Sequence, residues 1–147
     1  MTVSKAEYKK MAQKASPAST YAKDMLLAFV FGGGICTLGQ CFLDLYLYLK
    51  LDEKTAGAFV SITLIALTAV LTAARVYDNI AKYGGAGMIV PITGFANSVV
   101  SPAMEFKSEG FVLGIGAKMF VIAGPVLVYS TAASILYGLI LWFFHLY

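Results

Sequence analysis

The stretch YGGAGMIVPITGFANSVVSPAMEF, residues 83–106, is apolar enough to enter a lipid bilayer, yet it is rich in residues that interrupt a helix. It contains two prolines, four glycines, an asparagine and a glutamate. Each proline removes a backbone donor, and each glycine permits a turn or a close approach of backbones. Within hydrocarbon, a carbonyl without a donor is tolerated only where protein or a water-filled cavity covers it. The stretch therefore predicts a broken membrane element that faces other helices or a pore.

The composition of the whole chain points to the same environment. The chain has 147 residues, of which 59% are hydrophobic and 13% are charged, and its mean hydropathy is +0.77. These values are far from those of a soluble globular domain. A helix needs about 20 residues to cross a bilayer, so the chain has room for three to five crossings. We predict an all-α integral membrane protein with about four transmembrane helices, one of them broken or re-entrant.

Four apolar segments divide the single membrane domain that we predict for residues 24–147. The predicted spans are residues 25–49, 55–74, 86–106 as the broken element, and 119–144. For the broken element a full crossing and a re-entrant loop both remain open. The apolar run over residues 111–144 is too long for one straight crossing. We therefore expect an interfacial helix to about Gly116, followed by a span that is kinked at Pro125.

Residues 1–23 form a basic segment ahead of the first span. The lysines are Lys5, Lys9, Lys10, Lys14 and Lys23, and the acidic residue among them is Glu7. Tyr8, Met11, Ala12 and Ala15 recur at helical spacing, which is typical of an amphipathic helix on an anionic membrane surface. The alternative is a basic tail that only sets the orientation. In either case the excess of lysine and arginine on this side of the spans predicts a cytoplasmic N-terminus.

Two polar stripes interrupt the apolar helices. In the first span, Gly33, Thr37, Gln40 and Asp44 share one helix face that lipid would not satisfy. In the broken element, a helix from Gly94 onward would align a second set of small and polar side chains. That set is Gly94, Asn97, Ser98, Ser101 and Glu105. The second span also carries small and hydroxyl residues on one face, namely Gly57, Ser61, Thr68 and Thr72, and these indicate helix packing.

A small and polar stripe that ends in a carboxylate is suited to a solute path. The pore-lining or solute-contacting candidates are Gln40, Asp44, Pro91, Gly94, Asn97, Ser101 and Glu105. The alternative is a kinked, tightly packed helix in which Asn97 and Ser101 only bond to neighbouring helices. Glu105 and Asp44 would then be ordinary solvated charges at the interface.

Lys118 is a further candidate, for an internal ion pair. At mid-membrane depth its ammonium group would need a partner such as Glu105 or Asp44, whereas near the surface it would extend to the lipid headgroups. The rest of the sequence contains no nucleophile elbow, phosphate loop or cluster of metal ligands, and the one histidine is His145. We expect no enzymatic activity, no cofactor, no metal and no nucleic-acid partner.

Three motifs resemble a known family. FGGGICTLGQ, then GGAGMIVPITGFANSVVSPAMEFKSEG, then GIGAKMFVIAGPVLVY are similar to the stage V sporulation protein AC family. These are small membrane proteins of the spore dipicolinate transport system in endospore-forming bacteria. The resemblance runs from about residue 29 to the C-terminus. The N-terminal ASPASTYAKD departs from the lysine- and proline-rich lead-in of the family, which leaves contacts of the tail open.

The resemblance implies a channel or channel subunit in the inner membrane of the forespore and spore. The N-terminus, which the lysine and arginine count places on the cytoplasmic side, would then lie on the core side. The channel would move dipicolinic acid with calcium, inward during sporulation and outward at germination, with membrane tension as the proposed stimulus. The alternative is a structural or assembly subunit without its own pore. Other stage V sporulation membrane proteins are the implied partners. Because about four spans are too few to enclose a pore, we expect a homo- or hetero-oligomer.

Overall fold

The computed structural model describes residues 4–15 and 20–145, and none of them lies in a β-strand. The helices are α1 (Lys5–Ala15), α2 (Tyr21–Tyr48), α3 (Glu53–Ala73), α4 (Tyr77–Gly84), α5 (Ala86–Ile89), α6 (Ile92–Glu105) and α7 (Phe120–Phe143). A 3₁₀ turn, η1 (Lys107–Glu109), and a π-helical turn, η2 (Phe111–Gly116), connect α6 to α7. The predicted all-α class is confirmed.

Within the part of the chain that the structure describes, three helical segments are long and apolar enough to cross a membrane, judged by length and composition. They are α2, α3 and the run from Phe111 to Phe143 that contains α7. The expected break in residues 86–106 is also present, because α5 ends at Ile89 and α6 begins at Ile92. Pro91 lies between them with an extended backbone, at φ −63° and ψ 167°. The other proline, Pro102, is accommodated inside α6.

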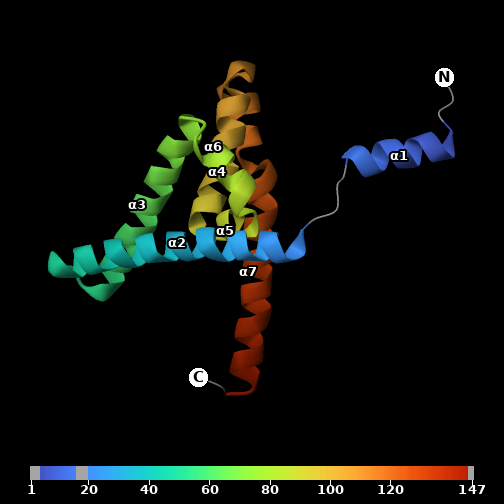
Figure 1. Cartoon of the computed structure of the whole chain (residues 1–147). Helices are drawn as coiled ribbons and strands as arrows, with labels where there is room; N and C mark the ends of the chain where they lie inside the picture. The colour runs from blue at the N-terminus through green and yellow to red at the C-terminus, as the bar shows by residue number, and fades with distance from the viewer. Residues whose placement is uncertain (1–3, 16–19, 146–147) are drawn as a thin grey trace.

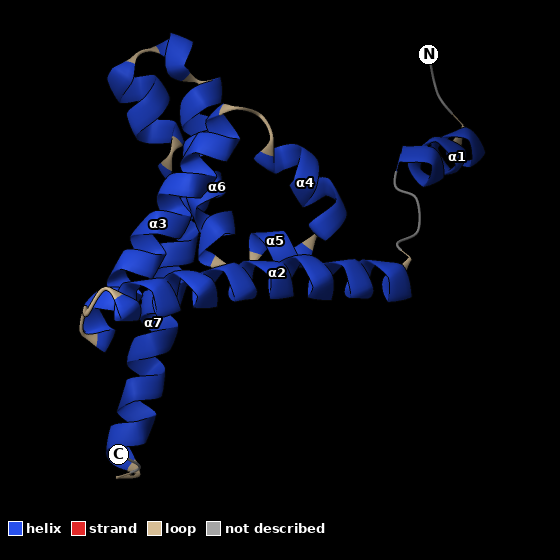
Figure 2. Cartoon of the chain, turned by 60° about the vertical axis from the view of Figure 1, so that its left-hand side comes forward, coloured by secondary structure: helices blue, strands red, loops and turns tan. Residues whose placement is uncertain are grey.

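The helices do not form a simple bundle (Figures 1 and 2). α3 and α6 lie side by side, and α4 and α5 fold back from the end of α3 onto α2. α7 packs beside α6 and then continues beyond the level of α2, to which it runs crosswise in Figures 1 and 2. If the bilayer normal is parallel to α7, α2 therefore runs roughly along the plane of the membrane. The four predicted crossings stay a prediction.

The N-terminal segment contains the expected helix within its described part. In α1, Ser4 and Glu7 form a capping box, with the Glu7 N–H donating to Ser4 Oγ at 3.3 Å and the Ser4 N–H donating to Glu7 Oε2 at 3.1 Å. Residues 1–3 and 16–19 of the predicted amphipathic segment lie outside the described residues. Residues 21–23, which the sequence placed in this segment, belong to α2 because the helix begins at Tyr21.

One face of α3 makes the main interhelical contact. Leu64, Thr68 and Thr72 recur every four residues, are buried, and lie on the side of α3 that faces the rest of the chain. Thr68 Oγ1 donates to the carbonyl of Leu64 at 2.8 Å, so its hydroxyl is satisfied within the helix and a close neighbour can pack on it. The predicted packing role of these hydroxyl residues is confirmed for Thr68 and Thr72. Gly57, nearer the start of the helix, is exposed.

The three long apolar helices end in the same way. The residue after each C-cap has a positive φ, 67° at Lys50, 59° at Arg75 and 51° at His145. At the end of α2 the Lys50 N–H donates to the Leu47 carbonyl at 3.0 Å and the Leu51 N–H donates to the Tyr46 carbonyl at 3.2 Å, which is a Schellman motif. Glycine is the usual residue at this position. Here the position is occupied by Lys50, Arg75 and His145, whose side chains lie near the negative end of the helix dipole.

The next helix, α3, begins immediately after this turn. Asp52 is its N-cap, and its carboxylate accepts the Thr55 N–H at 3.1 Å. Hydrogen bonds from Thr55 lower the pKa of the Asp52 carboxyl, since they favour its charged form. The carboxylate therefore keeps its capping charge at neutral pH and ends the turn between the two helices.

Two glycine-containing motifs of the sequence pack against each other. A Cβ added at Gly87 of α5 would overlap the backbone of Ala28 on α2, and one at Gly32 would stand 3.3 Å from the Cα of Gly87. A Cβ at Gly84 would likewise lie 3.1 Å from the side chain of Phe31. The two helix backbones therefore touch without side chains between them, which only glycine allows.

This contact predicts that Gly87→Ala destabilises the fold. We expect the free energy of unfolding to fall by about 1–3 kcal/mol, because the new methyl group meets rigid backbone that cannot move aside. Unfolding in detergent micelles, followed by circular dichroism, measures the change. Gly57→Ala is the matched control, since a Cβ there meets nothing within 4 Å and alanine favours the helix by up to about 1 kcal/mol. Equal stability of the two variants would contradict the role of the glycine contact.

Candidate functional site

A polar cleft of about 460 Å³ lies where the C-terminal end of α3, α4 and the C-terminal half of α6 meet. Its charged residues are Arg75, Asp78, Lys82, Glu105 and Lys107. Thr72, Asn79 and Ser101 add uncharged polar groups to the wall, and Met104 adds an apolar one. The cleft is therefore a place where three cations, two carboxylates and two hydroxyls surround one small volume.

Asn97 joins the three helices beside this cleft. Its Oδ1 accepts a hydrogen bond from Thr72 Oγ1 of α3 at 2.7 Å, and its Nδ2 donates to Asp78 Oδ1 of α4 at 3.3 Å. Thr72 is only 5% exposed, so its hydroxyl depends on this partner. The amide thus fixes the position of Asp78 relative to α6, and with it the acidic side of the cleft.

Arg75 and Lys82 are held by the short helix α4. Asn79 Nδ2 donates to the Arg75 carbonyl at 3.0 Å, and Lys82 Nζ donates to Asn79 Oδ1 at 3.2 Å. Arg75 has the positive φ that follows the C-cap of α3, as Lys50 and His145 do after α2 and α7, so this backbone conformation belongs to the end of the helix. The cationic side of the cleft is therefore built by α4 and the end of α3.

The N-terminal end of α4 is anchored by Tyr77, whose hydroxyl donates to the Met88 carbonyl at 2.8 Å. Burial raises the pKa of the Tyr77 phenol, and the neighbouring Asp78 carboxylate acts in the same direction. The phenol therefore stays protonated at neutral pH and remains a donor to α5. This bond keeps α4 folded against α5, so that Asp78 and Lys82 stay at the cleft.

The structure brings together three of the predicted site residues. Ser101 and Glu105 line the cleft, whereas Asn97 does not line it but bonds to Thr72 and Asp78, which do. The stripe predicted for the broken element therefore faces α3 and α4 along this part of α6. Ser98, which belongs to the same predicted stripe, donates to the carbonyl of Phe95 within its own helix at 2.7 Å. The hydrogen bonds of Asn97 to neighbouring helices agree with the packing interpretation, while Ser101 and Glu105 face open space.

The remaining predicted residues lie elsewhere. Gly94 packs against α5, where a Cβ would overlap the carbonyl of Ile89, and Pro91 forms the break that starts α6. Gln40 and Asp44 lie on α2 and do not line the cleft; Gln40 Nε2 donates to Asp44 Oδ1 at 2.9 Å. Lys118 Nζ stands 4.3 Å from the centroid of the Phe106 ring, a cation–π contact. Its proposed ion pair with a carboxylate stays a prediction.

The charged half of the cleft, with Arg75, Asp78, Lys82 and Lys107, was not among the site residues predicted from the sequence. The spacing of three and four residues from Arg75 to Asp78 to Lys82 places them on one face of a helix, and this was the available signal. Within residues 4–15 and 20–145 no group of three side chains is arranged to hold a metal ion.

Comparisons with known proteins agree on one family. A family model described as SpoVAC/SpoVAEB sporulation membrane protein matches residues 24–140. Stage V sporulation protein AC of Bacillus subtilis (strain 168) is 43% identical over 141 residues, which cover 95% of this chain and 94% of that protein. No solved structure matches the chain. The matched residues therefore include nearly all of α2, all of α3 to α6, and every residue that lines the cleft.

The network beside the cleft leads to a prediction for Asn97→Leu. We expect the free energy of unfolding to fall by about 1–3 kcal/mol, because the buried Thr72 hydroxyl loses its acceptor. In the double variant with Thr72→Val, the loss should be smaller than the sum of the two single losses by at least about 0.5 kcal/mol. Ser134→Leu, on the exposed part of α7, serves as the control. Additive losses would show that the two side chains are not coupled.

Proposed function

The chain belongs to the SpoVAC/SpoVAEB family of sporulation membrane proteins, and from this premise we propose that it is a channel or channel subunit for dipicolinic acid with calcium. The membrane would be the inner membrane of the forespore and spore, with the N-terminus on the core side. The observation that carries the proposal is the polar cleft, because it combines the α6 stripe with cationic side chains. Opening by membrane tension belongs to the same proposal and rests on the family resemblance.

The chemistry of the cleft suits a small dianion. Dipicolinate carries two carboxylates, and Arg75, Lys82 and Lys107 supply positive charge along the wall while Ser101 supplies a hydroxyl donor. The volume of about 460 Å³ falls within the range of about 300–1,000 Å³ that is usual for sites of small molecules. The cleft would therefore admit the anion at one mouth of a path.

Release matters as much as entry for a conducting site. Conduction requires binding that is favourable enough for entry and weak enough for exit. Asp78 and Glu105 reduce the net positive charge of the wall, so the anion would not be held by cations alone. Carboxylate oxygens are also the ligands that calcium prefers, so these two residues would face the accompanying cation. The mixed charge of the cleft is therefore better suited to the passage of dipicolinate than to its tight binding.

A single chain does not enclose such a path. Its described residues include three helical segments of spanning length, and α2 runs crosswise to α7. The proposal therefore includes a homo-oligomer or a complex with other stage V sporulation membrane proteins. The second candidate, a structural or assembly subunit without its own pore, is favoured by the far half of α7, whose side chains are exposed beyond the rest of the chain.

Flux through reconstituted liposomes tests the proposed role of the cleft. Ser101→Leu should reduce dipicolinate release at least several-fold, because the leucine side chain fills the cleft and removes a donor. Arg75→Gln should reduce it as well, because the wall loses a cation. Ser134→Leu on the exposed part of α7 is the control and should leave release unchanged. If all three variants release dipicolinate as fast as the wild-type protein, the cleft is not the path of the anion.

The same assay separates the two candidate functions. If the wild-type chain alone gives neither tension-dependent conductance nor release, and release appears only when its partner proteins are added, the assembly subunit is the better description. Release by the chain alone supports the channel.

A further inference from the structure

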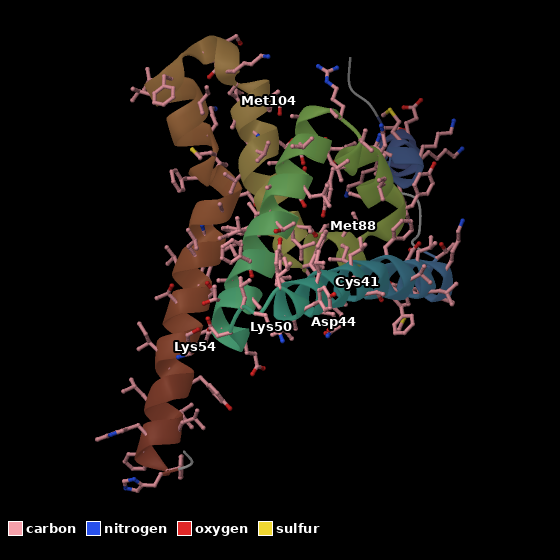
Figure 3. The ribbon with its side chains drawn as sticks, turned by 90° about the vertical axis from the view of Figure 1, so that its left-hand side faces the viewer. Cys41, Asp44, Lys50, Lys54, Met88 and Met104 are labelled. Atoms are coloured by element: carbon pink, nitrogen blue, oxygen red, sulfur yellow. The ribbon has the colours of Figure 1, made fainter. Side chains whose placement is uncertain are left out.

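A second cavity, separate from the polar cleft, lies between α2, α3 and α4. It has a volume of about 570 Å³, and Met88 of α5 and Thr93 of α6 complete its wall. In Figure 3, Met88 lies next to α2, between α3 and α4. Among the described residues, none lines both this cavity and the cleft. The cavity is therefore a site of its own.

The wall of this cavity is apolar and carries no charge. Aliphatic and aromatic side chains of α2 and α3 form most of it, and no lysine, arginine, aspartate or glutamate of the described chain lines it. Leu64 and Met88 are buried on its inner side, whereas Val30, Leu38 and Leu67 at its edge are exposed. Because α2 and α3 are both apolar segments of spanning length, the cavity is accessible from the membrane.

One polar group of the wall has no hydrogen-bond partner within the protein. Thr93 is only 5% exposed, and its Oγ1 is the one buried side-chain oxygen or nitrogen in the described part of the chain that lacks a partner. The nearby Tyr77 hydroxyl donates to the Met88 carbonyl instead. A buried hydroxyl without a partner is costly, so Thr93 indicates a polar group that the chain itself does not supply.

The other two threonines of the wall do not share this property. Thr37 Oγ1 donates to the Gly33 carbonyl at 2.9 Å, and Thr68 Oγ1 donates to the Leu64 carbonyl at 2.8 Å. Both hydroxyls are thus satisfied within their own helices. The polar demand of the cavity is therefore confined to the end where Thr93 and Tyr77 lie.

We propose that this cavity binds a single-chain lipid with an uncharged head, whose oxygen accepts a hydrogen bond from Thr93. The volume lies in the range of about 300–1,000 Å³ that is usual for ligand sites, which are mostly apolar with a few polar groups that fix orientation. The apolar wall holds the hydrocarbon chain, and a phosphate or carboxylate head would find no opposite charge there. A threonine on a helix has two accessible χ1 rotamers, so the Thr93 hydroxyl can turn toward the head. A long-chain alcohol has the required chemistry.

Gly34 allows the cavity to be filled without disturbing the fold. It lines the cavity, and a Cβ added there meets nothing within 4 Å, so the side chain of Gly34→Leu would occupy space that the ligand needs. Gly33→Leu is the matched control, because a Cβ at Gly33 also meets nothing within 4 Å but this residue does not line the cavity. Thr93→Val removes the hydroxyl, keeps the shape of the side chain and breaks no hydrogen bond of that hydroxyl within the chain.

Photolabelling of the full chain in liposomes tests the site. The probe is hexadecanol with a diazirine in its chain, and mass spectrometry locates the labelled residues. We expect label on the parts of α2 and α3 that line the cavity, a loss of at least several-fold in Gly34→Leu, and no change in Gly33→Leu. Thr93→Val should lower the hexadecanol label several-fold but leave unchanged the label from hexadecane with the same diazirine, which has no oxygen.

Three outcomes would overturn the proposal. Equal labelling of Gly34→Leu and Gly33→Leu would show that the label does not depend on the cavity. Equal labelling by hexadecanol and hexadecane, with no effect of Thr93→Val, would show that the head is not recognised. If phosphatidylcholine with the diazirine in one acyl chain labels the same residues as strongly as hexadecanol, the cavity holds an ordinary bilayer chain. Dipicolinate takes no part in this assay, so a failed flux assay would leave the proposed site standing.

Discussion

The contact between Gly87 of α5 and the Ala28–Gly32 turn of α2 is the constraint on which the rest of the structure depends. Because no side chain separates the two backbones, α5 lies directly on α2. The contact therefore fixes the position of Pro91, which follows α5, relative to α2. Pro91 then directs α6 away from α2 and along α3. Without this contact, the orientation of α6 relative to α2 would not be fixed, and Asn97 of α6 would not be held next to Thr72 of α3.

The position of α6 decides which polar groups meet. Asn97 lies at the point where α3, α4 and α6 come together, and it bonds to a hydroxyl of one helix and a carboxylate of another. Above it, the cleft gathers charges from the ends of helices, where a membrane protein can hold ionised side chains near water. The charged residues of the cleft thus lie at one end of the α3–α6 pair, and this arrangement is the basis of the transport proposal.

Much of the fold could be predicted from the sequence because its signals are local. Hydropathy over windows of about 20 residues identified the apolar helices, and the prolines and glycines of residues 83–106 located the broken element. Helical spacing also placed Asn97, Ser101 and Glu105 on one face of α6. The same reasoning placed Gly94 on this stripe, but the glycine serves the contact with α5, which spacing along one helix does not reveal.

The sequence by itself determined the membrane class, the helices and the polar stripes, because composition and periodicity depend only on neighbouring residues. Only the tertiary structure decided what each stripe faces. Arg75, Asp78 and Lys82 join the α6 stripe because α4 folds back between α3 and α2, and that path is set by contacts between residues about 55 positions apart in the chain, such as Gly84 with Phe31. In the same way, the two sides of α2 differ in their surroundings only because α5 and α3 cover one of them.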